Sequence, residues 1–119
     1  MKNDVNQMIN FAGEIGFLNG LLPVHLSDPN VFLPESVEAQ ARKIIKNLDE
    51  LLAVHHLTIS NVIAVQVFLK DFHRFYARFE AISNELFGQE SFITKNVVGV
   101  QALPRDALVS MNFVIQRKI

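Results

Sequence analysis

The chain has 119 residues, half of them hydrophobic and ten of them Phe, so it can bury a core as a single domain spanning residues 1–119. A net charge of −1 provides no basic surface for a nucleic-acid backbone, and we expect no nucleic-acid partner. The absence of Cys excludes disulfides, thiol catalysis and Cys-ligated zinc, and no apolar run is long enough to span a membrane. We therefore expect a cytoplasmic protein with no membrane partner, no cofactor and no metal.

The N-terminal part combines one predicted strand with a long segment rich in Gly and Pro. Apolar residues alternate imperfectly over residues 5–11, which predicts a strand. Residues 13–34 contain three Gly and three Pro, and this is long for an irregular connection in a compact domain. We expect either a short strand around residues 21–26 or a functional loop.

Two amphipathic helices are predicted, because apolar residues recur at spacings of three and four. The first spans residues 35–56, with Pro34 at its start. The second follows Asp71 as its cap and stops at Gly88. Its apolar stripe consists of Phe72, Phe75, Phe79, Ile82 and Leu86.

Three further strands are predicted in the second half of the chain. Residues 62–70 are rich in Val, Ile and Phe and predict a central strand. Residues 97–100 predict another, and the alternating segment 108–116 predicts a half-buried last strand. The order of elements favours an α+β fold, in which a small mixed sheet carries two helices on one face.

The strand at residues 62–70 is apolar on both sides, which argues against a monomer. One set of side chains can face the two helices, namely Ile63, Val65, Val67 and Leu69. The other set has no third helix to cover it and consists of Val62, Ala64, Gln66 and Phe68. An uncovered apolar sheet face is most simply buried against copies of the same chain.

Three motifs resemble the YjgF/RidA family, which also carries the name endoribonuclease L-PSP. The first is Gln-Ala-Arg at residues 40–42, followed by Asn-Leu at 47–48. The second, Val-Gln-Val-Phe-Leu-Lys-Asp at 65–71, is similar to a family strand that reads T-V-F-V-K-D. The third, Val-Gly-Val-Gln-Ala-Leu-Pro-Arg-Asp at 98–106, is similar to V-x-V-x-x-L-P-x-D. Residues 8–13 more weakly resemble a strand that ends in Ser-Gly.

The resemblance implies a chorismate-mutase-like homotrimer with helices outside, sheets packed together and a ligand cleft between each pair of subunits. Family members that are deaminases hydrolyse 2-imino acids to 2-keto acids and ammonia. They hold the substrate carboxylate with an Arg and position water with a Glu. Those two positions match Lys95 and Asn112, and the Ser-Gly pair matches Ala12 and Gly13. The family's N-terminal strand, with its Gly-Pro-Tyr, has no counterpart in this interpretation.

The two replacements change the expected chemistry. Lys attracts a carboxylate without the planar fork of Arg, and the Asn side chain cannot take a proton from water. We therefore predict a trimer that binds small carboxylate metabolites through Lys95, Asn112, Gly13 and Ala12, with imine deamination weak or lost and the catalytic residues unassigned. The alternatives are an active imine deaminase and, third, a ribonuclease or translation inhibitor. Lys95 as a solvated strand-edge residue and Asn112 as a polar residue on a wet sheet face also stay open.

Overall fold

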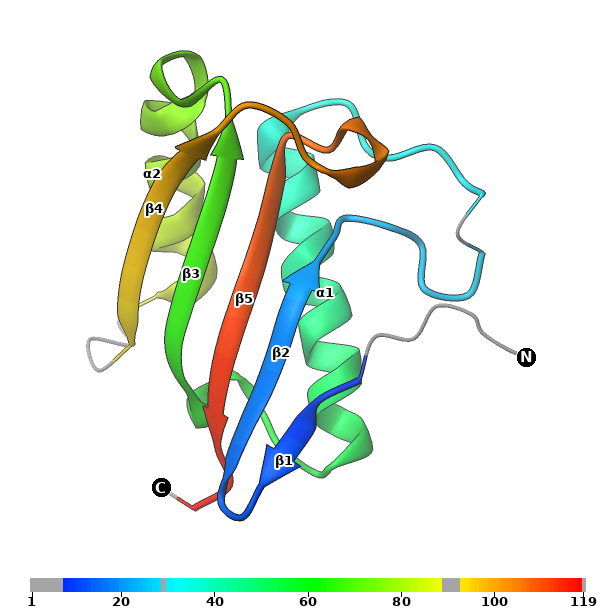
Figure 1. Cartoon of the computed structure of the whole chain (residues 1–119), viewed down its shortest axis with the longest axis vertical. Helices are drawn as coiled ribbons and strands as arrows, with labels where there is room; N and C mark the ends of the chain where they lie inside the picture. Colours follow the sequence, from blue (N-terminus) through cyan, green and yellow to red (C-terminus); the bar gives the residue numbers. More distant parts are fainter. Residues whose placement is uncertain (1–7, 29, 89–92, 119) are drawn as a thin grey trace.

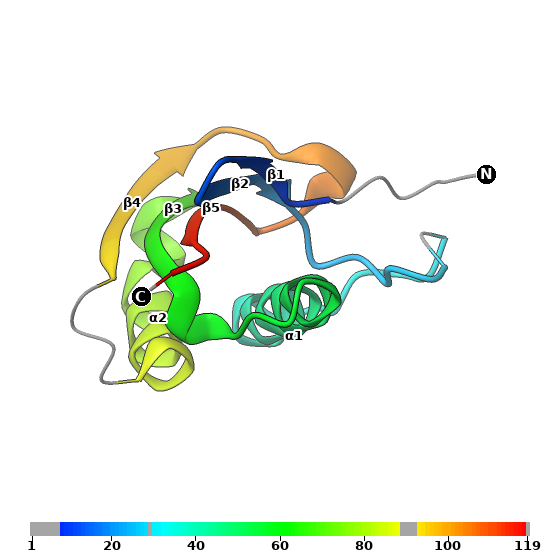
Figure 2. The same cartoon turned by 90° about the horizontal axis from the view of Figure 1, so that it is seen from below.

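The computed structural model describes residues 8–28, 30–88 and 93–118. Within them, the strands form one sheet with both helices on one of its faces (Figures 1 and 2). The elements are β1 (Asn10–Ala12), β2 (Ile15–Leu21), α1 (Val37–Val54), the 3₁₀ turn η1 (Ile59–Asn61), β3 (Val62–Lys70), α2 (Phe72–Phe87), β4 (Thr94–Val100), the 3₁₀ turn η2 (Pro104–Asp106) and β5 (Val109–Gln116). The strand order is β1-β2-β5-β3-β4.

The sheet is mixed. β3 and β4 are parallel and are connected through α2, whereas β1 with β2, β2 with β5 and β5 with β3 are antiparallel. Figure 2 shows the sheet as one layer and the two helices as the other. The predicted α+β fold with a small mixed sheet and two helices on one face is therefore confirmed. No helix of the described residues is long and apolar enough to cross a membrane.

The core lies between the helices and the sheet. Most residues of the apolar stripes predicted for α1 and α2 are buried there, together with alternate residues of β2, β3 and β5, whereas Phe72 and Leu86 of α2 are only partly buried. The fully buried large side chains include Phe79, Phe113, Leu18, Leu48, Leu69, Met111 and Ile115.

Both predicted helices are confirmed, with small differences at their ends. α1 begins after Ser36, whose Oγ accepts a hydrogen bond of 3.0 Å from the N–H of Ala39. α2 ends at Gly88, as predicted, with that glycine at φ +58°. Asp71 is the N-cap residue of α2, as predicted, but it does not cap the helix with its side chain. Asp71 has left-handed backbone geometry and its side chain makes no cap hydrogen bond.

The N-terminal prediction needs correction. Residues 5–7 of the predicted strand 5–11 lie outside the described residues, and β1 covers Asn10–Ala12. Residues 22–26 contain no strand; instead β2 runs over Ile15–Leu21, through two glycines that the sequence analysis placed in the connection. A Cβ at Gly16 would lie 2.7 Å from the Phe11 ring and 2.8 Å from Ile9, so this strand position requires glycine for close packing.

The side of the sheet to which each β3 side chain points was predicted correctly, except for the first two residues. Val65, Val67 and Leu69 are buried beneath the helices, as expected. Val62, however, is fully buried, whereas Ile63 is partly exposed. The pairing of β3 with β5 shifts register between residues 62 and 64, and this irregularity reverses the alternation at the start of the strand.

Two ion pairs connect the helices. Arg78 of α2 donates two hydrogen bonds to Glu38 of α1, at 2.9 and 2.7 Å, and Arg42 of α1 lies 3.1 Å from Glu85 of α2. The hydrogen bonds from Arg78 hold the pKa of the Glu38 carboxyl below its ordinary value.

Candidate functional site

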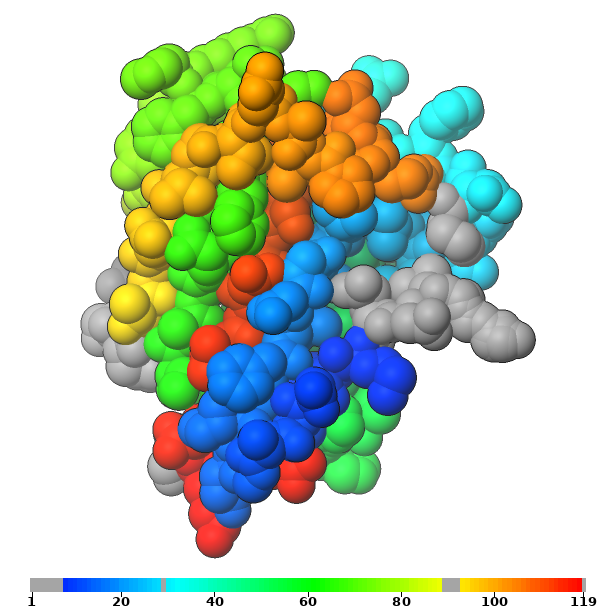
Figure 3. All heavy atoms as spheres, viewed as in Figure 1, coloured from blue at the N-terminus to red at the C-terminus, as the bar shows by residue number. Residues whose placement is uncertain are grey.

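The sheet face opposite the helices carries both apolar and amide side chains. Figure 3 shows this face, with the strands in front and the helices behind. Because side chains alternate along a strand, residues between the buried positions of β2, β3 and β5 point to this side. Phe17 and Val98 keep 44% and 36% of their surface exposed here, although both are large and apolar. Among the described residues, nothing covers these apolar side chains on this face.

A row of amides crosses this open face. Gln66 of β3 is paired in register with Asn96 of β4 and with Asn112 of β5. The Asn96 side chain donates a hydrogen bond of 3.0 Å to Gln66. Asn112 Oδ1 accepts a hydrogen bond of 2.6 Å from the N–H of Gly20. Gly20 lies where the pairing of β2 with β5 shifts register and has φ +70°, so Asn112 supports a glycine bulge.

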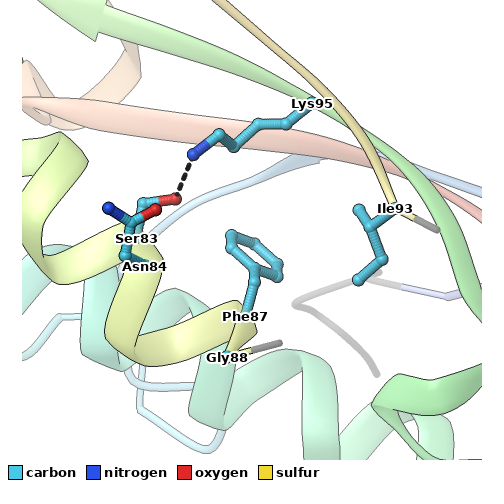
Figure 4. A pocket seen from close by; sticks show the side chains of 6 residues that line it. All are labelled: Ser83, Asn84, Phe87, Gly88, Ile93 and Lys95. Atoms are coloured by element: carbon cyan, nitrogen blue, oxygen red, sulfur yellow. Dashed lines mark hydrogen bonds between the residues drawn. The ribbon is translucent and has the colours of Figure 1, made fainter. Parts of the chain in front are cut away.

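Lys95 points to the opposite side of the sheet. It is paired in register with Val65, which is buried beneath the helices. Its ammonium donates a hydrogen bond of 2.9 Å to Ser83 Oγ of α2 (Figure 4). Both carboxylate oxygens of Glu80, one turn earlier in α2, lie 3.3 Å from the same ammonium. The side chains of Lys95 and Glu80 retain 25% and 28% of their surface exposed, so this ion pair is partly shielded from water.

A cavity of about 130 Å³ adjoins the Lys95 ammonium, between the last turns of α2 and the start of β4. Phe87 and Ile93 supply its apolar wall, and Lys95 and Ser83 its polar wall (Figure 4). Asn84 and Gly88 complete the lining. The lining of this cavity is more polar than apolar, and a concave site with a few placed polar groups can bind a small molecule.

The structure does not bring the four predicted ligand residues together in one chain. Lys95 lies on the helix side of the sheet and Asn112 on the open side. Ala12 is the last residue of β1, and Gly13 begins the β1–β2 hairpin turn with φ +64°. The glycine beside Asn112 is Gly20, at the other end of β2.

Sequence interpretation favours Glu80 as a surface charge rather than a catalytic residue, and it assigns no site role to Ser83 or Gly20. A signal was available for the first two, because Glu80, Ser83 and Phe87 follow one another at spacings of three and four and so share a side of α2.

The three motifs that carry the family resemblance meet at one end of the sheet. Gln40 of α1 accepts a hydrogen bond of 2.8 Å from the N–H of Leu108 and donates one of 2.8 Å to the carbonyl of Pro34. Lys70, the last residue of β3, forms an ion pair with Asp106 of η2, and this contact raises the pKa of Lys70. These contacts fix the turn that leads into β5, so the motif residues here have a structural role.

Charged and polar groups elsewhere in residues 8–28, 30–88 and 93–118 do not suggest a metal centre. No group of three or more His, Asp or Glu in those ranges is placed to hold a metal ion.

Comparison with known proteins agrees with the motifs and the fold. The model of the family described as endoribonuclease L-PSP matches residues 2–116. A RutC family protein of Pyrococcus horikoshii is 28% identical over 109 residues, covering 90% of this chain and 82% of that protein. The 2-iminobutanoate/2-iminopropanoate deaminase of Salmonella typhimurium is 27% identical over 110 residues, covering 89% of this chain and 82% of that enzyme.

The fold is shared with solved structures. The crystal structure of E. coli TdcF with bound serine superposes with a TM-score of 0.83 at 22% identity, covering 99% of this chain and 91% of that one. With the family model matching nearly the whole sequence, the chain belongs to the endoribonuclease L-PSP family, also called the YjgF/RidA family.

Proposed function

We propose that this protein binds small carboxylate metabolites in clefts between the subunits of a homotrimer, with Lys95 contacting the carboxylate. The observation that carries the proposal is the position of the Lys95 ammonium at the wall of a cavity of about 130 Å³ with Phe87 and Ile93 nearby. One charge beside an apolar wall suits a short acid with a small aliphatic tail. The TdcF structure with bound serine supports a ligand of this size in a protein of the same fold.

Two features of the single chain support the proposed assembly. The open sheet face exposes apolar side chains, among them Phe17 and Val98, which a second copy can bury. Lys95 and Asn112 point to opposite sides of the sheet, so a ligand that touches both must lie between two copies. A cyclic assembly brings two different surfaces of neighbouring subunits together, which is what such a shared site requires.

We propose that deamination of 2-imino acids is weak or lost. Asn112 is an amide that cannot accept a proton from water, and its Oδ1 already accepts the hydrogen bond from Gly20. Lys95 provides a point charge rather than the two-bond fork of Arg, and Glu80 partly neutralises that charge.

The alternative is an active imine deaminase in which Lys95 holds the carboxylate and the backbone holds the attacking water. The resemblance to a named 2-iminobutanoate/2-iminopropanoate deaminase supports it. An amino acid oxidase that generates the imine in the assay distinguishes the two functions. Decay of the imine at the rate of the Salmonella enzyme would establish deamination, and decay at the background rate would support binding alone.

Calorimetric titration with short 2-keto and amino acids tests the binding site. We expect affinities between about micromolar and millimolar, and a loss of about 10- to 100-fold in Lys95→Met, because a hydrogen bond to a charged group contributes roughly 1.5–3 kcal/mol. Lys46→Met is the matched control, since Lys46 is an exposed lysine of α1. If an acid binds and Lys95→Met leaves its affinity unchanged, Lys95 is not the carboxylate contact.

A further inference from the structure

The charge of Lys95 is already compensated within the chain. Both carboxylate oxygens of Glu80 lie 3.3 Å from the Lys95 ammonium. The side chains of Lys95 and Glu80 are about three-quarters buried, with 25% and 28% of their surface exposed. Ser83, which is fully buried, accepts the hydrogen bond of 2.9 Å from the same ammonium. The Lys95 ammonium at the cavity wall therefore has an anion 3.3 Å away rather than being a free positive charge, although Glu80 itself is not among the lining residues.

This arrangement disfavours a ligand that carries only a negative charge. A carboxylate that approaches the Lys95 ammonium also approaches the Glu80 carboxylate, and the two anions must then share one cation. Like charges at such a distance repel, and the repulsion is stronger where water is partly excluded. Displacing Glu80 would remove the repulsion only by breaking an existing ion pair.

A ligand with both charges avoids this conflict. Its carboxylate can accept a hydrogen bond from Lys95 while its ammonium donates one to Glu80, so that each charge of the site gains a partner. The cavity of about 130 Å³ has room for only a few heavy atoms, and Phe87 and Ile93 line it with apolar surface. A small α-amino acid with a short aliphatic side chain has these properties.

We infer that Glu80 is a specificity-determining residue that makes the Lys95 cavity select a small α-amino acid over the 2-keto acid with the same carbon skeleton. This inference rests on the proposed function, because it concerns the same cavity and the same carboxylate contact. Glu80 decides whether the amino acid or the keto acid binds more tightly, whereas Lys95 contributes to the affinity for both. The two residues can therefore be tested separately.

The test is a calorimetric titration of the assembled protein with 2-aminobutanoate and 2-oxobutanoate, which differ only at the 2-position. The wild-type protein should bind the amino acid about tenfold or more tightly than the keto acid, as expected for one additional charge-assisted hydrogen bond. Glu80→Gln should weaken binding of the amino acid about tenfold and strengthen binding of the keto acid by about threefold or more. These two effects have opposite signs, which a general distortion of the cavity cannot produce.

The matched control is Glu85→Gln, the same chemical change on the same helix. Glu85 pairs with Arg42 of α1 rather than with Lys95, so this variant should keep the wild-type preference. The mass in solution and the melting temperature of both variants show whether they are folded and assembled.

Equal or tighter wild-type binding of the keto acid, with binding still dependent on Lys95, overturns the role of Glu80 and leaves the proposed function standing. A parallel change in affinity for both acids in Glu80→Gln also overturns it. If neither acid binds, or if Lys95→Met has no effect on either, the proposed function fails and the inference fails with it.

Discussion

Phe17 offers a direct test of the open sheet face. It lies on β2, paired in register with Val114 of β5, and keeps 44% of its surface exposed in the single chain. Replacing it with Asp should lower the stability of one chain somewhat, because part of the Phe17 side chain is buried there, but the chain should still fold. In a trimer that buries this face, the same change places an unpaired carboxylate in an apolar contact.

The size of the effect follows from the exposed fraction. Fully burying a Phe side chain contributes about 1.5–3 kcal/mol, so burying the remaining 44% contributes roughly 0.7–1.3 kcal/mol per copy. Enclosing an unpaired carboxylate costs several kcal/mol more. A total loss of about 3 kcal/mol per copy weakens each contact more than about 100-fold. Phe17→Asp should therefore dissociate at micromolar concentrations at which the wild-type protein stays assembled.

Light scattering coupled to size exclusion measures the outcome. The wild-type mass should be three times the 13.5 kDa of one chain, and the Phe17→Asp mass should approach that of one chain. Val54→Asp is the control, because Val54 is 72% exposed at the end of α1, in the helical layer. A monomeric wild type, or a Phe17→Asp protein that remains a trimer, would refute the reasoning.

Two further predictions concern stability. Asn47 is fully buried and its Nδ2 donates hydrogen bonds to the carbonyls of Leu22 at 3.2 Å and Val24 at 2.8 Å, so Asn47→Ala should cost roughly 2 kcal/mol in denaturant unfolding. A loss below about 0.5 kcal/mol would show that these carbonyls find other donors. The pKa of Glu38 is lowered chiefly by its hydrogen bonds from Arg78. The stability that this ion pair contributes is therefore complete above the ordinary pKa of Glu, near 4.5, and is lost as the pH falls through the lower pKa of the folded protein. Between about pH 5 and about pH 3, the melting temperature of Glu38→Gln should therefore fall less than that of the wild-type protein. Melting temperatures that change identically with pH in the two proteins would contradict this.

The elements with a long and regular apolar pattern were predictable from the sequence. β3 and α2 have nine and sixteen residues, and their buried positions follow periods of two and 3.6 because each has a single buried side. β2 was not predictable in the same way, since its glycines suggest a turn. The need for Gly16 comes from Phe11 and Ile9 packing across β2, and this contact exists only after the hairpin has formed.

The candidate site shows the same limit. Lys95 was predicted from the motif that follows it, but its pairing with Glu80 depends on how α2 crosses over to β4. Asn112 was predicted from its spacing to Asp106, but the hydrogen bond from Gly20 depends on the bulge between β2 and β5. Local patterns identify the residues, whereas the partners that decide their chemistry come from distant elements.

The central claim is that Lys95 of one subunit and Asn112 of a neighbour form one ligand site. Coexpression of Lys95→Met and Asn112→Asp chains, followed by titration of the mixed trimers, tests this most directly. Asp at position 112 keeps an acceptor for the Gly20 N–H but places a negative charge beside the ligand carboxylate.

Each variant alone should bind weakly at all of its sites. In random mixed trimers, about a quarter of the sites should combine an intact Lys95 with an intact Asn112 and regain wild-type affinity. Mixed trimers that bind only as the average of the two variants would contradict a site shared between subunits.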